Sequence, residues 1–393
     1  MTTIEHIDFK NKKAIIRVDF NVPLNERFEV TDATRIEAAK PTIDHILKAG
    51  GSVILMSHLG RPKGVEEKYS LNHIVSKVAE ILGVPVKFAS DCVGSVALEA
   101  SESLKAGEVL LLENLRFHPE EEKGDVAFAQ QLASLGDIYV NDAFGTAHRA
   151  HASTTIIAQF FENKRCFGFL LAKEIESLNK VLHGAAHPVV AILGGSKISS
   201  KITVIENILD KIDHMIIGGG MTFTFIKALG GSIGNSLVED DKMALALEIL
   251  EKAKEKNVKI HLPVDVIAAD AFSNDAQIKL VDVNSIEAGW QGLDVGPKTL
   301  EALKPIIREA KTILWNGPLG VFELEKFSEG TISLGNMIAE ATKNGTFSLV
   351  GGGDSVAAVK QFNLEDKMSY VSTGGGAMLE MLEGKVLPGI AAI

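Results

Sequence analysis

The segment Phe347–Val359, FSLVGGGDSVAAV, joins a short apolar run to a helical pattern through three glycines and one acid. A short apolar run that ends in turn residues is typical of a buried strand. Similar runs, separated by helical patterns, recur at Ala14–Val18, Ser52–Met56, Val109–Leu112, Ile138–Val140, Val189–Leu193, His214–Ile217, Thr312–Trp315 and Tyr370–Ser372. Continuous apolar strands that alternate with helices predict parallel sheets covered on both faces.

The predicted strands fall into two blocks, and 393 residues is a length typical of two domains. Between the blocks, Lys173–Leu182 places Ile175, Leu178, Val181 and Leu182 on one helical face, and His183–Pro188 breaks the pattern. We therefore predict an α/β fold of two doubly wound parallel-sheet (Rossmann-like) domains, 1–170 and 186–375, joined by a linking helix at 171–185 and a hinge.

The composition indicates a soluble cytoplasmic protein. The net charge of −11 disfavours nucleic acid and anionic membranes as partners. No apolar run approaches the length of a membrane span, and the N-terminus has no apolar core like that of a signal peptide. The two cysteines, Cys92 and Cys166, lie far apart in no metal-ligand spacing, which fits a reducing compartment.

The two halves of the chain end their strands differently. Polar segments follow the strands of the first half: DFNVP begins at Asp19, SHLGRP at Ser57, ENLRF at Glu113 and NDAFGTAHRAH at Asn141. Glycine-rich segments follow the strands of the second half: GGSK begins at Gly194, GGG at Gly218, NGPLG at Asn316, GGGD at Gly351 and TGGG at Thr373. Because ligands of open parallel sheets bind beyond the carboxyl ends of strands, each half is expected to carry a binding site there.

Arginines gather at the strand ends of the first half. The guanidinium fork matches carboxylate and phosphate, and Arg35, Arg61, Arg116 and Arg149 occupy equivalent loops or the start of the next helix, with His58 and His148 beside them. Any one of these arginines could instead form a surface salt bridge. Four in equivalent places, in an acidic chain that otherwise prefers lysine, indicate a small and highly anionic ligand.

The glycine clusters of the second half let backbone N–H groups approach an anion closely. The chain has no GxxxxGK[ST] and no complete GxGxxG with a following acid, so neither a P-loop nor a dinucleotide fingerprint is present. After GGSK, a helix with the buried stripe Ile198, Ile202, Ile205, Leu209 and Ile212 begins with Lys197 and Lys201 one turn apart. Cations there oppose the helix dipole unless a polyphosphate is bound, although two solvated lysines remain the plain alternative.

Asp354 has two interpretations. It could hold the Mg²⁺ that accompanies a phosphate chain, mostly through water, or it could cap the following helix together with Ser355. Glu323 is a surface acid or a ribose-hydroxyl acceptor. An arginine-rich site and a glycine-rich phosphate site on separate domains suit phosphoryl transfer between two anionic ligands, because that chemistry depends on positioning and charge stabilisation.

The sequence resembles the phosphoglycerate kinase family in a series of motifs that occur in the same order along nearly the whole chain. These motifs are RVDFNVP, SHLGRP, ENLRF, NDAFGTAHRAH, GGSK, GLDVGP, NGPLGVFE, GGGDS and STGGGA. The resemblance implies the reversible reaction of 1,3-bisphosphoglycerate and Mg-ADP to 3-phosphoglycerate and Mg-ATP, in glycolysis and gluconeogenesis, by in-line transfer after hinge closure. It also implies a monomer, and a C-terminal segment, 376–393, that returns to the 3-phosphoglycerate domain 1–170 and leaves 186–375 as the nucleotide domain.

The resemblance also implies residue roles. The residues expected to contact the glycerate and its phosphate are Asp19, Asn21, Arg35, His58, Arg61, Arg116 and Arg149. Asp354 is expected to bind the metal. The residues expected to contact the nucleotide are Gly194, Gly195, Lys197, Lys201, Gly218, Gly219, Gly292, Leu293, Asn316, Pro318, Glu323, Gly352, Gly353, Asp354 and Ser355. The moving phosphoryl group is expected to meet Arg35, Lys197, Gly352 and Gly375.

Two rival functions fit parts of the pattern. A different two-domain kinase could act on another phosphorylated acid. A two-lobed ligand-binding protein without catalysis is the other rival, but it would have no use for two separate anion sites.

Overall fold

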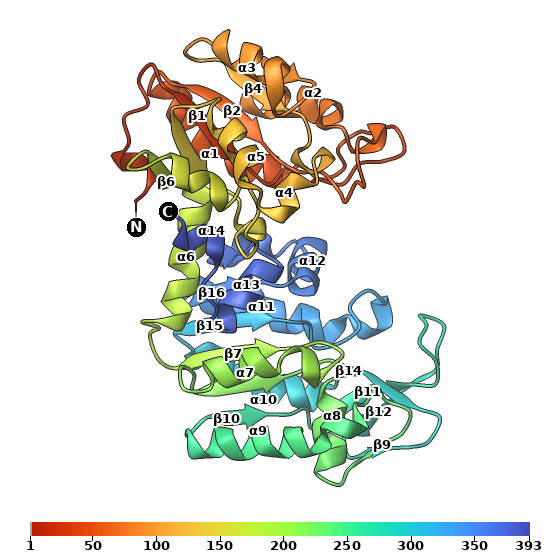
Figure 1. Ribbon diagram of the computed structural model, residues 1–393. Coiled ribbons are helices and arrows are strands. Elements are labelled where there is room, and N and C mark those ends of the chain that lie inside the picture. Colours follow the sequence, from red (N-terminus) through yellow and green to blue (C-terminus); the bar gives the residue numbers. More distant parts are fainter. Residues whose placement is uncertain (1) are drawn as a thin grey trace. The chain divides into compact units, whose positions relative to one another are not determined.

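The computed structural model describes residues 2–393 and divides them into two compact units (Figure 1). The first unit runs to Glu176 and includes Val386–Ile393, and the second is Ser177–Lys385. The division falls inside helix α6 (Phe169–Leu182), whose residues Ile175, Leu178, Val181 and Leu182 are buried as their helical spacing predicts.

The first unit is built on a six-stranded sheet of order β3-β4-β2-β1-β5-β6. All neighbouring strands pair in parallel. The strands are β1 (Lys13–Arg17), β2 (Ser52–Met56), β3 (Val86–Ala89), β4 (Val109–Leu112), β5 (Ile138–Asn141) and β6 (Arg165–Phe167). The helices are α1 (Thr34–Lys48), α2 (Val75–Leu82), α3 (Gly94–Glu102), α4 (Glu120–Lys123), α5 (Val126–Ala133) and α14 (Pro388–Ala391).

Both faces of this sheet are covered by apolar cores. Ile16 belongs to one core, which also holds Ile43 of α1, whereas its neighbour Ile15 belongs to the other core together with Leu132 of α5. Successive strand residues point to opposite faces, so a strand buried on both sides has no polar alternation. This explains why apolar runs such as Ser52–Met56 carry the strands of this fold.

The C-terminal helix α14 completes the first unit (Figure 1). The Gly389 N–H donates to the Ala147 carbonyl at 2.8 Å, and the Asn141 side-chain amide donates to the Gly389 carbonyl at 3.1 Å. The return to this unit falls at Val386, whereas the sequence predicted it at 376. The reason is that α13 (Gly376–Leu382) packs on α7 (Ile202–Ile208) of the second unit.

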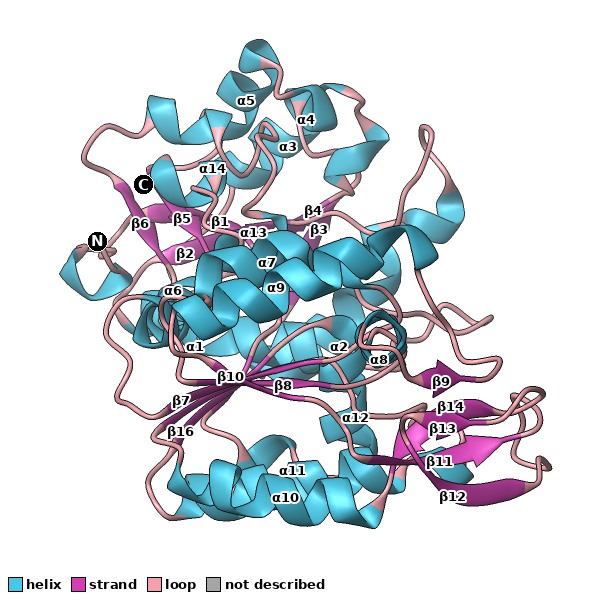
Figure 2. Ribbon diagram, turned by 90° about the horizontal axis from the view of Figure 1, so that it is seen from below, coloured by secondary structure: helices cyan, strands magenta, loops and turns pink. Residues whose placement is uncertain are grey.

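The second unit has its own six-stranded parallel sheet, of order β10-β8-β7-β15-β16-β17. Its strands are β7 (Val189–Leu193), β8 (His214–Ile217), β10 (Lys259–His261), β15 (Thr312–Asn316), β16 (Phe347–Val350) and β17 (Tyr370–Val371). Helices α10 (Pro297–Glu309) and α11 (Glu329–Lys343) cover one face, and α7 and α9 (Met243–Glu255) cover the other (Figure 2). The remaining helices are α8 (Thr222–Ala228) and α12 (Gly353–Gln361).

The second unit also contains two small sheets, and the three strands of the larger one lie between β10 and α10 in the chain. An antiparallel sheet of order β12-β11-β14 contains β11 (Asp265–Ala269), β12 (Ile278–Asp282) and β14 (Gln291–Val295). A parallel pair joins β9 (Ser232–Ile233) to β13 (Ser285–Ile286). Short 3₁₀ turns lie at Ile4–His6, Glu67–Tyr69, Leu71–Ile74, Leu115–Phe117, Phe144–Thr146, Ile156–Phe160, Ile198–Ser200, Asp240–Lys242, Glu325–Phe327 and Glu365–Lys367.

The predicted fold class, two doubly wound parallel sheets, is confirmed. Of the strands that the sequence did not predict, β3 buries only Ala89 fully, and the residues of β12 alternate between exposed and half-buried. Such strands lack the continuous apolar run on which the prediction depended. Within residues 2–393 the structure contains no helix with the length and hydropathy of a membrane span.

Candidate active site

The carboxyl ends of the first unit's strands bring most of the predicted anion-binding residues together. The Arg35 guanidinium donates to the Asp19 carboxylate at 2.9 Å and to the Asn21 carbonyl at 3.2 Å. The Asn21 side-chain oxygen accepts from the Gly60 N–H at 2.8 Å, and Arg116 donates to the Gly60 carbonyl at 2.9 Å. Loops after β1, β2 and β4 are therefore tied into one surface that ends in two guanidinium groups.

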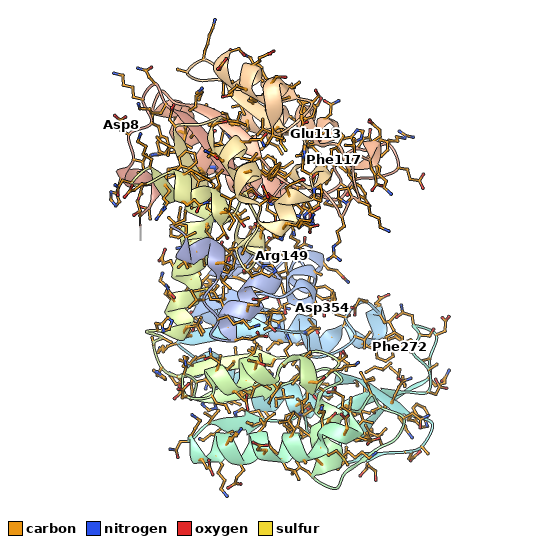
Figure 3. The ribbon with its side chains drawn as sticks, in the orientation of Figure 1. Asp8, Glu113, Phe117, Arg149, Phe272 and Asp354 are labelled. Atoms are coloured by element: carbon orange, nitrogen blue, oxygen red, sulfur yellow. The ribbon has the colours of Figure 1, made fainter. Side chains whose placement is uncertain are left out.

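Arg149 and Arg61 complete the predicted set at the same strand ends. Arg149 follows β5 in the sequence and is labelled in Figure 3, and its Nε–H donates to His148 Nε2 at 3.3 Å. The guanidinium of Arg149 lies near enough to act on the charges of Arg116 and His151. Arg61 follows β2 and is exposed.

The sequence prediction missed Arg17, which is fully buried beneath this surface. Its Nε–H donates to the Ser153 hydroxyl at 2.8 Å, and its Nη2 lies 3.1 Å from His58 Nδ1. Ser153 in turn donates its N–H, at 3.0 Å, to the buried carboxylate of Glu121. Arg17 sits inside the apolar strand AIIRV, and that interruption of a buried strand by a cation is the one signal that could have revealed it.

Burial and then the positive charge of the site favour the neutral form of His58 and His151. Burial, then Arg17, Arg116 and Arg35, lowers the pKa of His58 well below its usual value. Burial and the neighbouring guanidinium groups also lower the pKa of His151 to about 4. His58 is predicted to contact the anion, yet it is almost fully buried and serves Arg17 as a hydrogen-bonding partner.

An unsatisfied donor points to a missing acceptor in this cluster. The buried Nε of Arg116 has no hydrogen-bond partner among residues 2–393, and the carboxylate of Glu122 is 3.6 Å away. Buried donors are normally paired, so an anion that accepts from Arg116 would remove a cost of roughly 1–3 kcal/mol. The cluster therefore suits a phosphorylated or carboxylated ligand.

The second unit contains a cavity of about 410 Å³ at the carboxyl ends of its strands. Figure 3 labels two residues of its wall, Phe272 and Asp354. The predicted nucleotide residues in its lining are Gly195, Gly219, Gly292, Leu293, Pro318, Glu323 and Asp354. This size matches small-molecule and cofactor pockets, which are mostly apolar with a few polar groups.

The apolar side of the cavity was not predicted. Phe223 of α8, Val266 of β11, and Leu237 and Phe272 of nearby loops line it, and the Phe223 ring lies against Gly292. These residues come from a short helix, one strand of the inserted sheet and two loops, where single apolar residues give no periodic signal. The buried hydroxyl of Thr222 also lies in the lining and has no hydrogen-bond partner within the described chain, so it can bind a polar ligand atom.

Several predicted glycines serve packing between loops. A Cβ on Gly194 would lie 2.1 Å from the Pro318 carbonyl oxygen, and one on Gly219 would lie 2.7 Å from the Gly195 nitrogen. Side chains there would force the strand-end loops apart. Gly353 differs, because a Cβ there would meet nothing within 4 Å, so its backbone is open to a ligand. Gly194 and Gly218 lie outside the cavity lining, behind the loops that form it.

Lys201 and Asn316 form a polar contact at the same strand ends. The Asn316 amide also donates to the Gly351 carbonyl at 2.8 Å, which ties β15 to the GGGD turn. Burial lowers the pKa of Lys201, and the negative charge of Asp354 opposes that shift. A half-buried ammonium group near one carboxylate is suited to receive a phosphate.

The capping interpretation of Asp354 is wrong. Helix α12 begins at Gly353 with Gly352 at its N-cap, and no side chain makes the capping bond. Asp354 is exposed in the first turn, while the buried Ser355 hydroxyl accepts from the Gly317 N–H at 2.5 Å. The carboxylate of Asp354 is therefore available at the cavity wall.

The helix predicted after GGSK begins later than its pattern indicated. Ile198–Ser200 is a 3₁₀ turn, and α7 starts at Ile202, so Lys197 precedes the turn and is exposed. Ile198, Ile205, Leu209 and Ile212 are buried as predicted, but Ile202 is only half-buried. Gly375 likewise stands at the N-terminus of α13, in a positive-φ conformation.

Asp294 is a buried acid in the cavity wall that the sequence did not single out. One carboxylate oxygen accepts from the Gly330 N–H at 2.8 Å, at the start of α11, and the other accepts from its neighbour Val295 at 2.9 Å. Burial, the largest effect, raises the pKa of Asp294 to about 7 despite these bonds. The carboxyl group thus ties strand β14, in the cavity wall, to the first turn of helix α11.

We expect Asp294→Asn to flatten the dependence of stability on pH. The raised pKa means that the folded state keeps a proton that the unfolded state has lost from about pH 4 upward. The free energy of unfolding should therefore fall as pH rises to about 7, by at most about 1.4 kcal/mol per pH unit from this group. Denaturant unfolding at a series of pH values, followed by tryptophan fluorescence, measures the free energy of unfolding of the second unit, since Trp290 and Trp315 both belong to it.

The matched control is Asp142→Asn, because burial also raises the pKa of Asp142 to about 7 but this residue lies in the first unit. It should leave the tryptophan-detected slope largely unchanged. An Asp294→Asn curve as steep as that of the wild type would contradict the assignment of the slope to Asp294.

Comparison with known proteins gives a consistent result. The sequence profile of the family named phosphoglycerate kinase matches residues 4–385. A phosphoglycerate kinase of Porphyromonas gingivalis is 54% identical over 415 aligned positions, covering 100% of this chain and 99% of the relative. A cytosolic phosphoglycerate kinase of Triticum aestivum is 52% identical and covers 100% and 97%.

Solved structures agree with this result. The phosphoglycerate kinase structure from Coxiella burnetii is similar with a TM-score of 0.91 and 42% identity, covering 99% of this chain and 98% of that one. The structure from Pyrococcus horikoshii has a TM-score of 0.84 at 31% identity and covers 100% and 98%. With its two parallel sheets, its cationic strand ends and its nucleotide-sized cavity, the chain belongs to the phosphoglycerate kinase family.

Proposed function

We propose that this chain transfers a phosphoryl group reversibly between 1,3-bisphosphoglycerate and Mg-ADP, giving 3-phosphoglycerate and Mg-ATP in glycolysis and gluconeogenesis. The observation on which the proposal depends is that this member of the family has two sites of different chemistry, one in each unit. One unit ends its strands in guanidinium groups, and the other ends them in a cavity of about 410 Å³ lined by glycine backbone and apolar side chains.

The first unit is the proposed 3-phosphoglycerate domain. Arg61, Arg116 and Arg149 hold the remote phosphate, and the buried charge of Arg17 adds to their field. Asp19 and Asn21 orient the glycerate, and the ion pair of Asp19 with Arg35 supports this role because it places a guanidinium beside them. His58 acts through Arg17, with which it is in contact.

The second unit is the proposed nucleotide domain. The apolar wall of the cavity suits the faces of an adenine ring, and Glu323 in the same wall suits the ribose hydroxyls. Lys201, Asn316, Gly352, Gly353 and Ser355 cluster at the carboxyl ends of β15 and β16, where they hold the phosphate chain. Gly194 and Gly218 keep the supporting loops close.

No general base is needed for this transfer. The acceptor in the ATP-consuming direction is a carboxylate, which is already an anion and a nucleophile. The residues therefore have to position the two ligands and stabilise the charge of the moving group. We assign that task to Arg35 of one unit and Lys197 of the other, with the backbone at Gly352 and Gly375, after the units close on the ligands and exclude water.

Asp354 is the proposed residue for Mg²⁺. Mg²⁺ prefers carboxylate oxygen and retains several waters, and the exposed carboxylate at the cavity wall fits that chemistry. When bound with the nucleotide, the ion neutralises phosphate charge. The neighbouring Lys201 shares the same electrostatic environment.

We expect Asp354→Ala to raise the Mg²⁺ concentration that gives half-maximal activity by at least ~10-fold, the scale of one charged contact. Activity is titrated with Mg²⁺ at fixed total ADP. Asp366→Ala, which removes an exposed acid of the same unit, is the matched control and should titrate like the wild type. An unchanged titration for Asp354→Ala would count against the metal role.

A coupled assay of ATP consumption tests the reaction itself. ATP should be consumed with 3-phosphoglycerate present and not when either substrate is omitted. Consumption without the glycerate would identify an ATPase, and consumption only with another phosphorylated acid would identify a different kinase. Binding of both ligands without turnover would favour a ligand-binding protein.

We further propose a monomer in the cytoplasm. The wheat relative is named cytosolic, which supports the location. A single species at the mass of one chain in light scattering would agree with the monomer, and a doubled mass would contradict it.

A further inference from the structure

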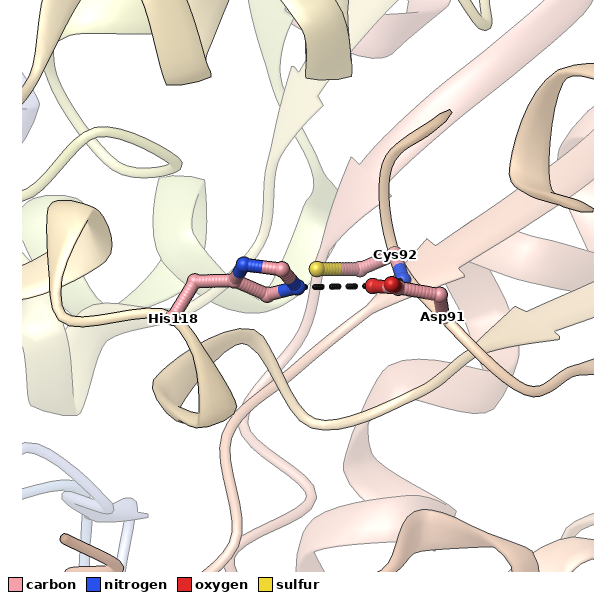
Figure 4. Close-up of side chains that lie close together, drawn as sticks. All are labelled: Asp91, Cys92 and His118. Atoms are coloured by element: carbon pink, nitrogen blue, oxygen red, sulfur yellow. Dashed lines mark hydrogen bonds and ion pairs between the residues drawn. The ribbon is translucent and has the colours of Figure 1, made fainter. Parts of the chain in front are cut away.

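Asp91, Cys92 and His118 form a cluster of potential metal ligands in the first unit (Figure 4). Each offers one donor atom, and these atoms all lie within 4.8 Å of one another. The sequence gave no sign of the cluster, because His118 comes from a different loop. Asp91 and Cys92 follow β3, His118 follows β4, and the two strands are parallel neighbours whose carboxyl ends lie side by side.

The surrounding contacts hold the donors in place. The Asp91 carboxylate accepts from the Cys92 N–H at 2.7 Å, which fixes it beside the thiol. The His118 ring packs on Phe128, with ring centroids 5.3 Å apart, and its Nε2 lies 2.7 Å from Asp91 Oδ1. Figure 4 shows that Nε2 faces both the carboxylate and the Cys92 sulfur.

The cluster is closed on the thiol side and open to solvent on the other. Cys92 is fully buried, whereas the side chains of His118 and Asp91 are 30% and 44% exposed. An ion could therefore enter past the imidazole and carboxylate and keep a water as its fourth ligand. Three protein ligands and one open position are the usual arrangement of a zinc ion that is not purely structural.

We propose that Asp91, Cys92 and His118 bind a zinc-like divalent cation. A thiolate, an imidazole and a carboxylate suit Zn²⁺, whereas Mg²⁺ prefers oxygen ligands alone. Tetrahedral zinc places its donor atoms roughly 3.4–3.6 Å apart. Binding therefore requires the 2.7 Å contact between His118 Nε2 and Asp91 Oδ1 to open and the Cys92 sulfur, within 4.8 Å of both, to come closer.

Binding releases the thiol proton to solvent, and the sulfur then donates its electron pair to the ion. No oxidant or second substrate is involved. The site is separate from Asp354, which belongs to the second unit, and it uses none of the residues assigned to the phosphoryl transfer.

Cobalt substitution tests the proposal on the full chain without nucleotide. Co²⁺ bound to a thiolate gives a sulfur-to-metal charge-transfer band in the near ultraviolet, which cobalt on carboxylates alone does not give. We expect one Co²⁺ per chain with this band, displaced by one equivalent of Zn²⁺. Because only a thiolate produces the band, weak cobalt binding at Asp354 does not interfere.

The variants separate the ligands from general effects. Cys92→Ser should abolish the band, whereas Cys166→Ser, which alters the other buried cysteine of the same unit, should retain it. His118→Gln should weaken cobalt affinity at least ~10-fold. His118 is partly exposed, so this variant remains informative if Cys92→Ser does not fold.

Absence of the band with cobalt in excess over the wild-type protein would overturn the proposal, and the His118–Asp91 contact would then be an ordinary hydrogen bond. Persistence of the band in folded Cys92→Ser would overturn it equally. An unchanged cobalt affinity in His118→Gln would remove the imidazole from the site and contradict the three-ligand assignment.

Discussion

Lys197→Ala is expected to lower turnover by at least ~10²-fold with little change in stability. Lys197 is exposed and precedes the 3₁₀ turn at Ile198–Ser200, so its removal leaves no buried group unpaired. We assign its ammonium group to the phosphoryl group in transit, and loss of one preorganised charge donor costs on the order of 10²–10³ in turnover. Steady-state kinetics at saturating concentrations of both substrates measures the effect.

The matched control for Lys197 is Lys254→Ala, which removes an exposed lysine of helix α9 in the same unit. It should keep the wild-type rate. Since Lys197 acts on the transferring group, kcat should fall much more than the affinity for ADP. Near-wild-type turnover in Lys197→Ala would exclude this lysine from the transfer step.

Arg35→Ala is expected to lower turnover by a similar factor, at least ~10²-fold, and to weaken 3-phosphoglycerate binding as well. Arg35 donates to both Asp19 and Asn21, so its loss also leaves the Asp19 carboxylate without its ion-pair partner. The uncompensated negative charge would then repel the anionic substrate. Kinetics with 3-phosphoglycerate varied at saturating Mg-ATP separates the two effects.

Arg35→Lys keeps the charge but loses the fork, and it should give an intermediate loss because bidentate guanidinium contacts are not replaced by an ammonium group. Arg27→Ala removes an exposed arginine of a nearby loop and should behave like the wild type. A fully active Arg35→Ala would refute the assignment of this arginine to the reacting end of the substrate.

The fold was largely predictable because its central strands are buried on both faces. Runs such as Ser52–Met56 and Val189–Leu193 are continuous apolar strands, and the structure places strands at these same residues. The inserted sheet was not predictable from such runs. Strand β12 is an exposed edge strand, and its alternation of exposed and half-buried residues resembles that of a polar loop.

The sequence predicted the site residues that form a cluster of charge, but it did not predict those whose role depends on burial. Arginines at equivalent strand ends indicated an anion site, and the structure ties Arg35 and Arg116 together through Asn21 and Gly60. Arg17, by contrast, lies within an apolar strand, and its role depends on contacts with His58 and Ser153, which are 41 and 136 positions away.

Other properties depended on tertiary packing in the same way. The pKa of Asp294 is raised by burial, which a sequence does not reveal. Lys197 was predicted to begin a helix, whereas the local backbone forms a 3₁₀ turn first.

The central claim is that each unit holds one substrate, and separate binding measurements on two variants test it most directly. Calorimetry should show that Arg149→Ala weakens 3-phosphoglycerate binding at least ~10-fold and leaves Mg-ADP binding within about twofold, whereas Lys201→Ala does the reverse. If either variant weakened both ligands equally, or if Arg149→Ala affected only the nucleotide, the assignment of the substrates to the two units would be contradicted.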